Sequence, residues 1–300
     1  MEDRIITYGG QAVIEGVMMR GQKGFAIAMR APDGEIVIHK EKLGEIYRSK
    51  ITKIPFVRGV ILLWDALGLG MRALTLAANT QTGEDEKLEG PALYITMGIS
   101  LTIGIGLFFL LPALAGGWLQ NLMSPAAAAS TSGLWAGNLL EGVLRLLLLI
   151  GYIWAIGFMP DVKRLFGYHG AEHKTINAFE AGAELTPESV AKFSLEHPRC
   201  GTAFLLTLVL FSIVAFTLLG PLPIFWRLVS RILLIPVLAG VSLEYIRWTA
   251  NHLNNPLVKI LIKPNLALQS LTTREPDMSM LEVAIKSFNT MREAEQEFSL

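Results

Sequence analysis

The segment Leu93–Gly117 reads LYITMGISLTIGIGLFFLLPALAGG and contains no charged residue. An α-helix needs about twenty apolar residues to cross the hydrocarbon core of a bilayer, and this segment is long enough to do so. Three further segments are of similar length and mostly apolar: Leu134–Met159, Thr202–Gly220 and Leu228–Ile246. The chain is therefore predicted to be an α-helical integral membrane protein with about four transmembrane helices.

The composition of the 300-residue chain agrees with a bilayer as its main partner. Only 17% of the residues are charged, whereas soluble domains have about a quarter. The 26 basic and 26 acidic residues cancel, which argues against a nucleic-acid partner held by a broad positive face. Cys200 is the single cysteine, so no internal disulfide is expected. The first twenty residues carry charges and glycines where a signal peptide has an apolar core.

The basic residues predict the orientation of the apolar segments. Residues 1–92 hold twelve Lys or Arg, the loop 118–133 holds none and the loop 160–201 holds five. Because loops rich in Lys and Arg stay on the cytoplasmic side, both termini and the middle loop are expected in the cytoplasm. The predicted location is thus the cytoplasmic membrane, with a multi-pass topology.

A fifth apolar segment, Ile54–Ala78, carries charges that argue against a transmembrane helix. Arg58, Asp65 and Arg72 recur every seven residues and share one helical face. Each charge would cost roughly 2.5 to 3.5 kcal/mol at the middle of a bilayer. We therefore expect an amphipathic helix lying in the membrane interface or packed on the bundle, with an ordinary core helix of the soluble part as the alternative.

The N-terminal part has the pattern of β-strands. The stretches AVIEGVMMR, FAIAMR and EIVIHKEKL are separated by the turn-forming GQKG and APDG, which predicts a small three-stranded meander. The predicted organisation begins with a cytoplasmic β-meander at 1–47, followed by an amphipathic helix and linker at 48–90. A four-span bundle at 91–248 follows and includes the cytoplasmic loop 160–201. The cytoplasmic helical tail at 249–300 contains a helix capped by Asp277.

The most informative polar motif is HGAEH, within the stretch YHGAEHKTINAFEAG at 168–182. In a helix His169 and His173 project from one face about 6 Å apart, so both imidazoles can bind one ion. Glu172 could orient a metal-bound water and accept its proton. The motif matches the inverted HxxEH pattern of zinc hydrolases, and so predicts a divalent metal site with zinc as the expected ion.

The source of the remaining ligands stays open at this point. His197 and Cys200, in HPRCG, would complete a closed tetrahedral site, which is typical of structural zinc. Glu244 would instead leave one position for water, which is typical of catalytic zinc. A third interpretation needs no metal, because the two histidines of the motif could simply hydrogen-bond neighbouring carboxylates such as Glu180.

A second polar feature lies inside an apolar segment. Glu141 and Arg145 are four residues apart in NLLEGVLRLLL. An ionisable group at that depth is costly and suggests a function, although the two side chains could also pair with each other to lock helix packing.

Several motifs together resemble the YqhQ-like family of bacterial membrane proteins, a domain of unknown function. They are YGGQAVIEGVMMRG, PFVRGVILLWDALGLGMRAL, YHGAEHKTINAFEAG, HPRCGTAFLL and LALQSLTTREPD. The resemblance implies a predicted metal-dependent enzyme without an established substrate or reaction. By position, the polar motif residues of the family fall on Glu15, Arg58, Asp65, Glu141, His169, Glu172, His173, Asn177, Glu180, His197, Arg199, Cys200, Glu244 and Arg247.

The leading hypothesis is a bacterial inner-membrane hydrolase that depends on zinc bound at the cytoplasmic interface. Glu172 would be its general base, and its substrate or protein partner is unknown. Two alternatives come from other classes: a non-enzymatic membrane scaffold or assembly factor with a structural metal site, and a transporter that uses Glu141 and Arg145 as an intramembrane relay.

Overall fold

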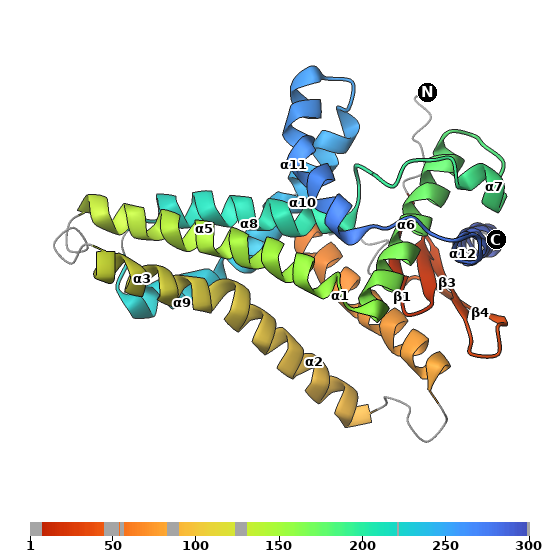
Figure 1. Ribbon diagram of the computed structural model, residues 1–300, viewed down its shortest axis with the longest axis horizontal. Coiled ribbons are helices and arrows are strands. Elements are labelled where there is room, and N and C mark those ends of the chain that lie inside the picture. Colours follow the sequence, from red (N-terminus) through yellow and green to blue (C-terminus); the bar gives the residue numbers. More distant parts are fainter. Residues whose placement is uncertain are drawn as a thin grey trace.

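The computed structural model describes residues 8–44, 54, 57–82, 90–123, 131–220 and 222–298. This part of the chain is mostly helical, with one antiparallel sheet near its N-terminal end (Figure 1). The sheet lies at one end of the molecule, and long apolar helices extend away from it. The linker expected before the first apolar segment falls mostly outside the described residues.

The sheet has four strands in the order β1-β2-β3-β4, each antiparallel to the next. The strands are β1 (Gly9–Val13), β2 (Gly16–Arg20), β3 (Gly24–Arg30) and β4 (Ile36–Lys42). The prediction of three strands is wrong because AVIEGVMMR folds back on itself, with Val13 paired to Gly16 across the two-residue turn Ile14–Glu15. Glu15 has φ 50°, a left-handed conformation that residues other than glycine seldom adopt. No Gly, Asn or Asp marks the turn centre, so the apolar alternation hides it.

Both faces of the sheet are covered by helices from distant parts of the chain. Because side chains alternate along a strand, Val17 and Met19 face α6 (Pro160–Glu180) and α12 (Met278–Glu297), with the short α7 (Pro187–Val190) beside them. Met18 instead faces α1 (Val57–Gln81). We call the sheet with α6, α7, α12 and the second half of α1 the sheet region. In this region, the N-terminal strands pack with helices from the middle and the C-terminal end of the chain in common hydrophobic cores.

The apolar helices form an arm beside the sheet region. They are α2 (Gly90–Ile105), the π-helical turn η4 (Gly106–Leu110), α3 (Leu111–Met123), α5 (Thr131–Ile156), α8 (Gly201–Leu218) and α9 (Ile224–Leu233). Within the described residues, three helices are long and apolar enough to cross a membrane: Gly90–Leu119, Trp135–Ile156 and Gly201–Leu218. A fourth is present if α9 and α10 (Ile235–Asn251) count as one span with a 43° bend. Pro236 lies at this bend, and proline has no backbone N–H to donate to a helical hydrogen bond.

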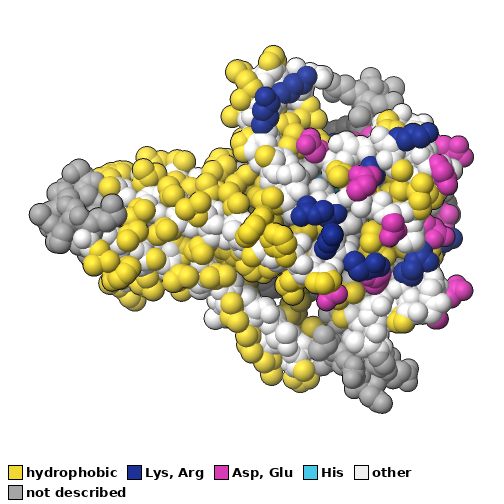
Figure 2. Space-filling view, viewed as in Figure 1, with side chains coloured by type: hydrophobic (Ala, Val, Ile, Leu, Met, Phe, Trp, Pro, Cys, Tyr) yellow, Lys and Arg dark blue, Asp and Glu magenta, His cyan; other side chains and the backbone are white. Residues whose placement is uncertain are grey.

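Polar and apolar side chains separate along the molecule. Figure 2 shows hydrophobic side chains over the arm, whereas Lys, Arg, Asp and Glu gather over the sheet region. Large apolar side chains of the arm are strongly exposed, among them Tyr94, Trp118 and Leu147. Exposed apolar surface of this extent marks contact with lipid or another apolar partner. About four apolar helices were predicted, and the described residues contain three to four of the required length and composition. Their crossing of a membrane and their orientation in it stay predictions.

Two further sequence expectations are settled by the packing. Ala73 and Ala77 of α1 are buried against the sheet, so the second half of α1 is a core helix, the alternative that the sequence left open. The first half packs on the helix bundle, as also expected, because Arg58 pairs with Glu244 of α10. The helix α12 begins after Asp277, whose Oδ1 accepts a hydrogen bond of 2.9 Å from the Met280 N–H, as the capping pattern predicts. Before it, α11 (Pro256–Thr272) returns the chain from α10 to the sheet region.

Candidate metal centre

The helix α6 places the two histidines of the HxxEH motif side by side. The ring centroids of His169 and His173 are 4.4 Å apart, as the spacing of one helical turn predicts. Gly170 lets the C-terminal segment approach this helix, since a Cβ there would lie 2.2 Å from the carbonyl oxygen of Arg274. The helix is therefore held between the sheet and the segment that follows α11.

Backbone carbonyls fix the ring orientation of both histidines. His169 Nδ1 lies 2.9 Å from the Thr272 oxygen, and His173 Nδ1 lies 2.5 Å from the Leu195 oxygen. A carbonyl only accepts, so each Nδ1 donates its hydrogen there and each Nε2 is left to face another group. His173 is 1% exposed, and its Nε2 has no hydrogen-bond partner among the described residues. Histidines that bind metal are typically held in this way, with Nδ1–H donated to a carbonyl and Nε2 facing the ion.

Cys200 supplies a third donor atom at this position. Its Sγ lies 3.2 Å from His169 Nε2 and caps α8 by accepting from the Thr202 N–H at 3.4 Å. Cysteine binds metal through this sulfur atom. The candidate ligand atoms of His169, His173 and Cys200 lie within 4.8 Å of one another. Sulfur and nitrogen ligands of a tetrahedral zinc are about 3.5 Å apart, so a small contraction would close the group on one ion.

His197 lies next to this group, but it faces another partner. Its ring centroid is 5.7 Å from that of His173, while its Nε2 lies 3.7 Å from Glu180 Oε2 and 3.4 Å from Arg199 Nη2. Gln269 holds the His197 backbone through two hydrogen bonds of 2.9 and 3.0 Å. Burial lowers the pKa of His197, and the negative charge of Glu172 partly opposes this effect. Within the described chain, the ligand group thus has three members.

Glu172 is buried beside the ligand group with an oxygen unused. Its Oε2 has no hydrogen-bond partner within the described part of the chain, and the backbone N–H of Gly10 donates to the carboxyl group. Burial raises the pKa of Glu172, and His169 and His197 oppose this effect only in their protonated forms. Gly10 allows this close approach, because a Cβ there would lie 2.8 Å from Glu172 Cγ and Cδ.

A cavity of about 210 Å³ lies beside the centre, lined by Glu172 and Cys200 but not by His169 or His173. Glu172 forms part of its wall together with His197, Arg199 and Cys200 from the segment before α8, and Arg20 contributes from β2. It therefore joins an unpartnered carboxylate oxygen, a candidate metal ligand and two guanidinium groups in one space. Such a cavity is large enough for several water molecules or one small substrate group.

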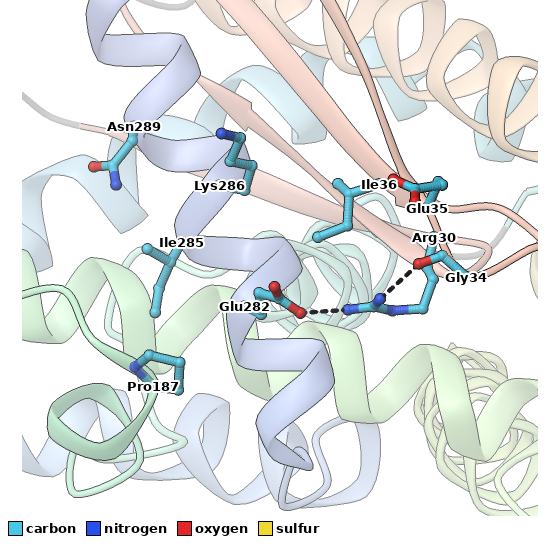
Figure 3. A pocket seen from close by; sticks show the side chains of 9 residues that line it. All are labelled: Arg30, Gly34, Glu35, Ile36, Pro187, Glu282, Ile285, Lys286 and Asn289. Carbon is cyan, nitrogen blue, oxygen red and sulfur yellow. Dashed lines mark hydrogen bonds and ion pairs between the residues drawn. The ribbon is translucent and has the colours of Figure 1, made fainter.

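A second hollow of about 420 Å³ lies between α12 and the β3–β4 turn (Figure 3). Arg30 crosses it, donating to the Gly34 carbonyl at 2.9 Å and pairing with Glu282 at 2.7 Å. Its described lining contains neither histidine nor cysteine. We therefore place the candidate site in the smaller cavity.

The remaining residues named by the sequence lie in several places. Glu244 forms an ion pair with Arg58 between α10 and α1, and Arg247 lies near this pair. Glu244 is thus outside the group formed by His169, His173 and Cys200. The side chain of Asp65 lies outside the described residues.

Three other candidates shape the surroundings of the centre. Asn177 donates to the carbonyls of Ser194 and Glu196, which holds the loop carrying Leu195. Glu180 pairs with Arg199 at the cavity wall. Glu15 accepts two hydrogen bonds of 2.6 Å from Arg164 and one of 3.2 Å from the Tyr168 hydroxyl, so it ties the β1–β2 turn to α6.

Sequence reasoning found only part of the second polar cluster. Glu141 and Arg145 form an ion pair at 2.7 Å, as one alternative predicted. Arg227 and Arg231 join them at 2.9 and 2.8 Å, and neither was singled out. Their spacing of four residues within a mostly apolar stretch was the available signal, because it places both guanidinium groups on one face of α9.

The fold and the centre define a mostly helical protein with a small antiparallel sheet, a histidine-cysteine group, and three to four helices long and apolar enough to cross a membrane. Residues 54–294 match the family described as "Protein of unknown function (DUF1385)", so the chain belongs to this family. It is 35% identical over 302 residues to the uncharacterized protein YqhQ of Bacillus subtilis (strain 168), covering 95% of this chain and 92% of that relative. No solved structure matches the chain.

Proposed function

We propose that the protein is a metal-dependent hydrolase of the bacterial inner membrane, with zinc held by His169, His173 and Cys200 where the arm meets the cytoplasmic sheet region. The observation that carries the proposal is the pair of imidazoles whose Nδ1–H groups are held by carbonyls while their Nε2 atoms turn to one buried place. A buried lone pair without a partner, as on His173 Nε2, is costly unless something binds it. A cation explains this arrangement better than a hydrogen bond to a carboxylate.

A three-membered ligand group favours catalysis over a purely structural role. Closed structural zinc sites have four protein ligands, whereas catalytic sites keep one position for water or substrate. The neighbouring His197 could close the site, but its Nε2 faces Glu180 and Arg199 instead. Bound zinc would supply Lewis-acid activation of water and of the group being hydrolysed.

Glu172 is the residue that would handle the proton. Its carboxyl group has an unused buried oxygen, and burial holds its pKa above the ordinary value. A carboxylate of raised pKa accepts a proton from water more readily and can later return it to a leaving group. Gly10 keeps this carboxyl in place through its N–H, so Gly10 and Glu172 would act together.

The experiment compares zinc content and hydrolysis in detergent-purified variants. We expect about one zinc per chain in the unaltered protein, loss of zinc in His173→Ala and Cys200→Ser, and full zinc in Glu172→Gln. His252→Ala is the matched control, because His252 is an exposed histidine whose Nδ1 bonds to the carbonyl of Trp248. Hydrolysis would be followed with a panel of ester, amide and phosphoester substrates.

The two functional classes give different results in this comparison. A hydrolase predicts that Glu172→Gln keeps zinc and loses all hydrolysis. A scaffold with structural zinc predicts that Glu172→Gln behaves like the unaltered protein and that Cys200→Ser loses its fold. Absence of zinc from the unaltered protein under zinc-replete expression would contradict both. The transporter alternative has no observation in its favour, because the Glu141 and Arg145 side chains bond to neighbouring groups within the arm.

A further inference from the structure

The helix α9 buries its charged side chains and exposes its apolar ones, which is the opposite of an amphipathic helix in a water-soluble protein. It buries Arg231 completely and Arg227 almost completely, with 13% of the Arg227 side chain exposed. Its apolar residues Ile224, Phe225 and Trp226 are instead 56%, 65% and 59% exposed. A helix that turns charges inward and apolar side chains outward suits contact with lipid around a polar interior.

The buried arginines of α9 converge on Glu141 of α5. Arg231 donates to both carboxylate oxygens at 2.9 and 2.8 Å, Arg227 donates to Oε2 at 3.1 and 2.9 Å, and Arg145 donates to Oε1 at 2.7 Å. The side chains of Glu141, Arg145 and Arg231 have no exposed surface. We call these four residues the arginine cluster.

Arg145 also satisfies a carbonyl that the arm leaves without its helical donor. Pro112 has no N–H to give to the carbonyl four residues earlier, that of Phe108, and Arg145 Nε donates to it at 2.9 Å. Arg145 Nη1 contacts Ser212 Oγ at 3.2 Å. The guanidinium of Arg145 is therefore fixed, with each of its three nitrogens bonded to a different group.

Both carboxylate oxygens of Glu141 accept hydrogen bonds, but the charges of the arginine cluster do not cancel. Arginine stays protonated in proteins, so three guanidinium groups face one carboxylate and leave an excess of two positive charges. The face of Phe216 lies 4.2 Å from Arg231 and 5.0 Å from Arg145, which attracts the cations without neutralising them. Among the described residues bonded to these arginines, Glu141 is the only acidic one. Uncompensated charge in an apolar bundle calls for an anion.

Arg227 is the member of the cluster that an anion from outside can reach. Its side chain keeps some exposure, and Nε and Nη2 are the nitrogens that bond to Glu141. The third nitrogen, Nη1, lies over the bare backbone of Gly117, where an added Cβ would be 3.2 Å away. The exposed apolar side chains of α9 begin within one turn of this nitrogen along the helix.

We propose that the arginine cluster binds the phosphate group of an acidic membrane lipid at Arg227. The phosphate would offset the excess charge, and an acyl chain would lie along Ile224, Phe225 and Trp226. Guanidinium groups bind phosphate well because their donors match its oxygens. This site lies in the arm and does not rest on the zinc proposed for the sheet region.

The test is native mass spectrometry and thermal unfolding of the full chain in nanodiscs. We expect one retained phosphatidylglycerol per chain, a higher unfolding temperature in phosphatidylglycerol than in phosphatidylcholine, and about tenfold weaker binding in Arg227→Gln. Lys259→Gln controls for general attraction to an acidic surface, because Lys259 is exposed on α11 away from the cluster. It should retain the lipid.

A second variant keeps the charge and tests the geometry. Gly117→Ala would place a methyl group beside Arg227 Nη1 and should weaken phosphatidylglycerol binding, whereas Gly104→Ala meets nothing within 4 Å and should not. Equal retention of phosphatidylglycerol by Arg227→Gln, or equal binding of phosphatidylcholine, would overturn the proposal. Stabilisation by inorganic phosphate in phosphatidylcholine, with no preference for phosphatidylglycerol, would overturn a lipid as the source and leave a site for free phosphate.

Discussion

The two buried polar groups of this protein differ in what they lack. In the candidate metal centre of the sheet region, two buried atoms, His173 Nε2 and Glu172 Oε2, have no hydrogen-bond partner among the described residues. The arginine cluster in the arm uses both oxygens of Glu141 and still keeps an excess of positive charge. Unused lone pairs indicate a missing cation, whereas surplus guanidinium groups indicate a missing anion.

This difference predicts the most damaging single substitution. Glu141→Gln would leave three buried guanidinium groups without a carboxylate, and breaking a buried ion pair costs about 3 to 5 kcal/mol. We expect a loss of that size in the free energy of unfolding, measured by denaturant titration in detergent. Arg227→Gln should cost clearly less, because it reduces the excess charge. Equal stability of Glu141→Gln and the unaltered protein would contradict the charge imbalance.

Metal removal should destabilise the sheet region and leave the arm cluster unaffected. A ligand that binds the folded state at one hundred times its dissociation constant stabilises it by about 2.7 kcal/mol. Chelation of zinc should therefore lower the unfolding temperature of the unaltered protein and of Arg227→Gln by the same amount. His173→Ala should not respond to the chelator. A response in His173→Ala equal to that of the unaltered protein would place the metal elsewhere.

Gly10 offers a smaller change that separates the proton acceptor from the metal ligands. Gly10→Ala would set a Cβ 2.8 Å from both the Glu172 side chain and the Met18 carbonyl oxygen. Overpacking of this kind costs about 1 to 3 kcal/mol, so we expect a lower unfolding temperature with unchanged zinc content. The adjacent Gly9→Ala meets nothing within 4 Å and is the control. Loss of zinc in Gly10→Ala would mean that the strand also holds the ligands in place.

The weakest expected effect concerns the turn that joins the sheet to α6. Arg164 lowers the pKa of Glu15, so this carboxylate stabilises the fold above its unfolded pKa of about 4.3 and loses that contribution as pH falls through the lower folded pKa. The Arg164 side chain is 52% exposed, which limits the effect to at most about 1 kcal/mol.

The matching experiment is a pair of thermal unfolding series between pH 6 and pH 3. Glu15→Gln should lose less stability over this range than the unaltered protein. The double variant with Arg164→Gln should behave like Glu15→Gln alone. A full acid response in Glu15→Gln would show that other carboxylates dominate.

Much of the fold follows from local pattern. The apolar helices are visible because composition over about twenty residues decides whether a helix suits a bilayer. The strand count was wrong at Ile14–Glu15, since a left-handed glutamate in a tight turn carries no sequence signal of its own. The layering of the N-terminal strands with α6 and α12 depends on contacts between residues far apart in the chain, and no local pattern encodes it.

The centre shows the same limit at the scale of single residues. Helical spacing alone predicts that His169 and His173 lie together, and the structure brings Cys200 to them from the loop before α8. The carbonyls of Thr272 and Leu195 fix the rings, but a main-chain acceptor can come from any residue type. Glu244 had a plausible spacing, and its pairing with Arg58 depends on how α1 packs against α10.

The most direct measurement is X-ray absorption at the zinc edge of the purified, zinc-loaded protein. Two imidazole nitrogens, one sulfur and one light atom not supplied by the chain should surround the ion, and the sulfur should vanish in Cys200→Ser. A shell of three imidazoles and one sulfur would instead mean that His197 closes the site, and a shell without sulfur would remove Cys200 from it. Either result would contradict an open catalytic zinc centre built on α6 and the start of α8.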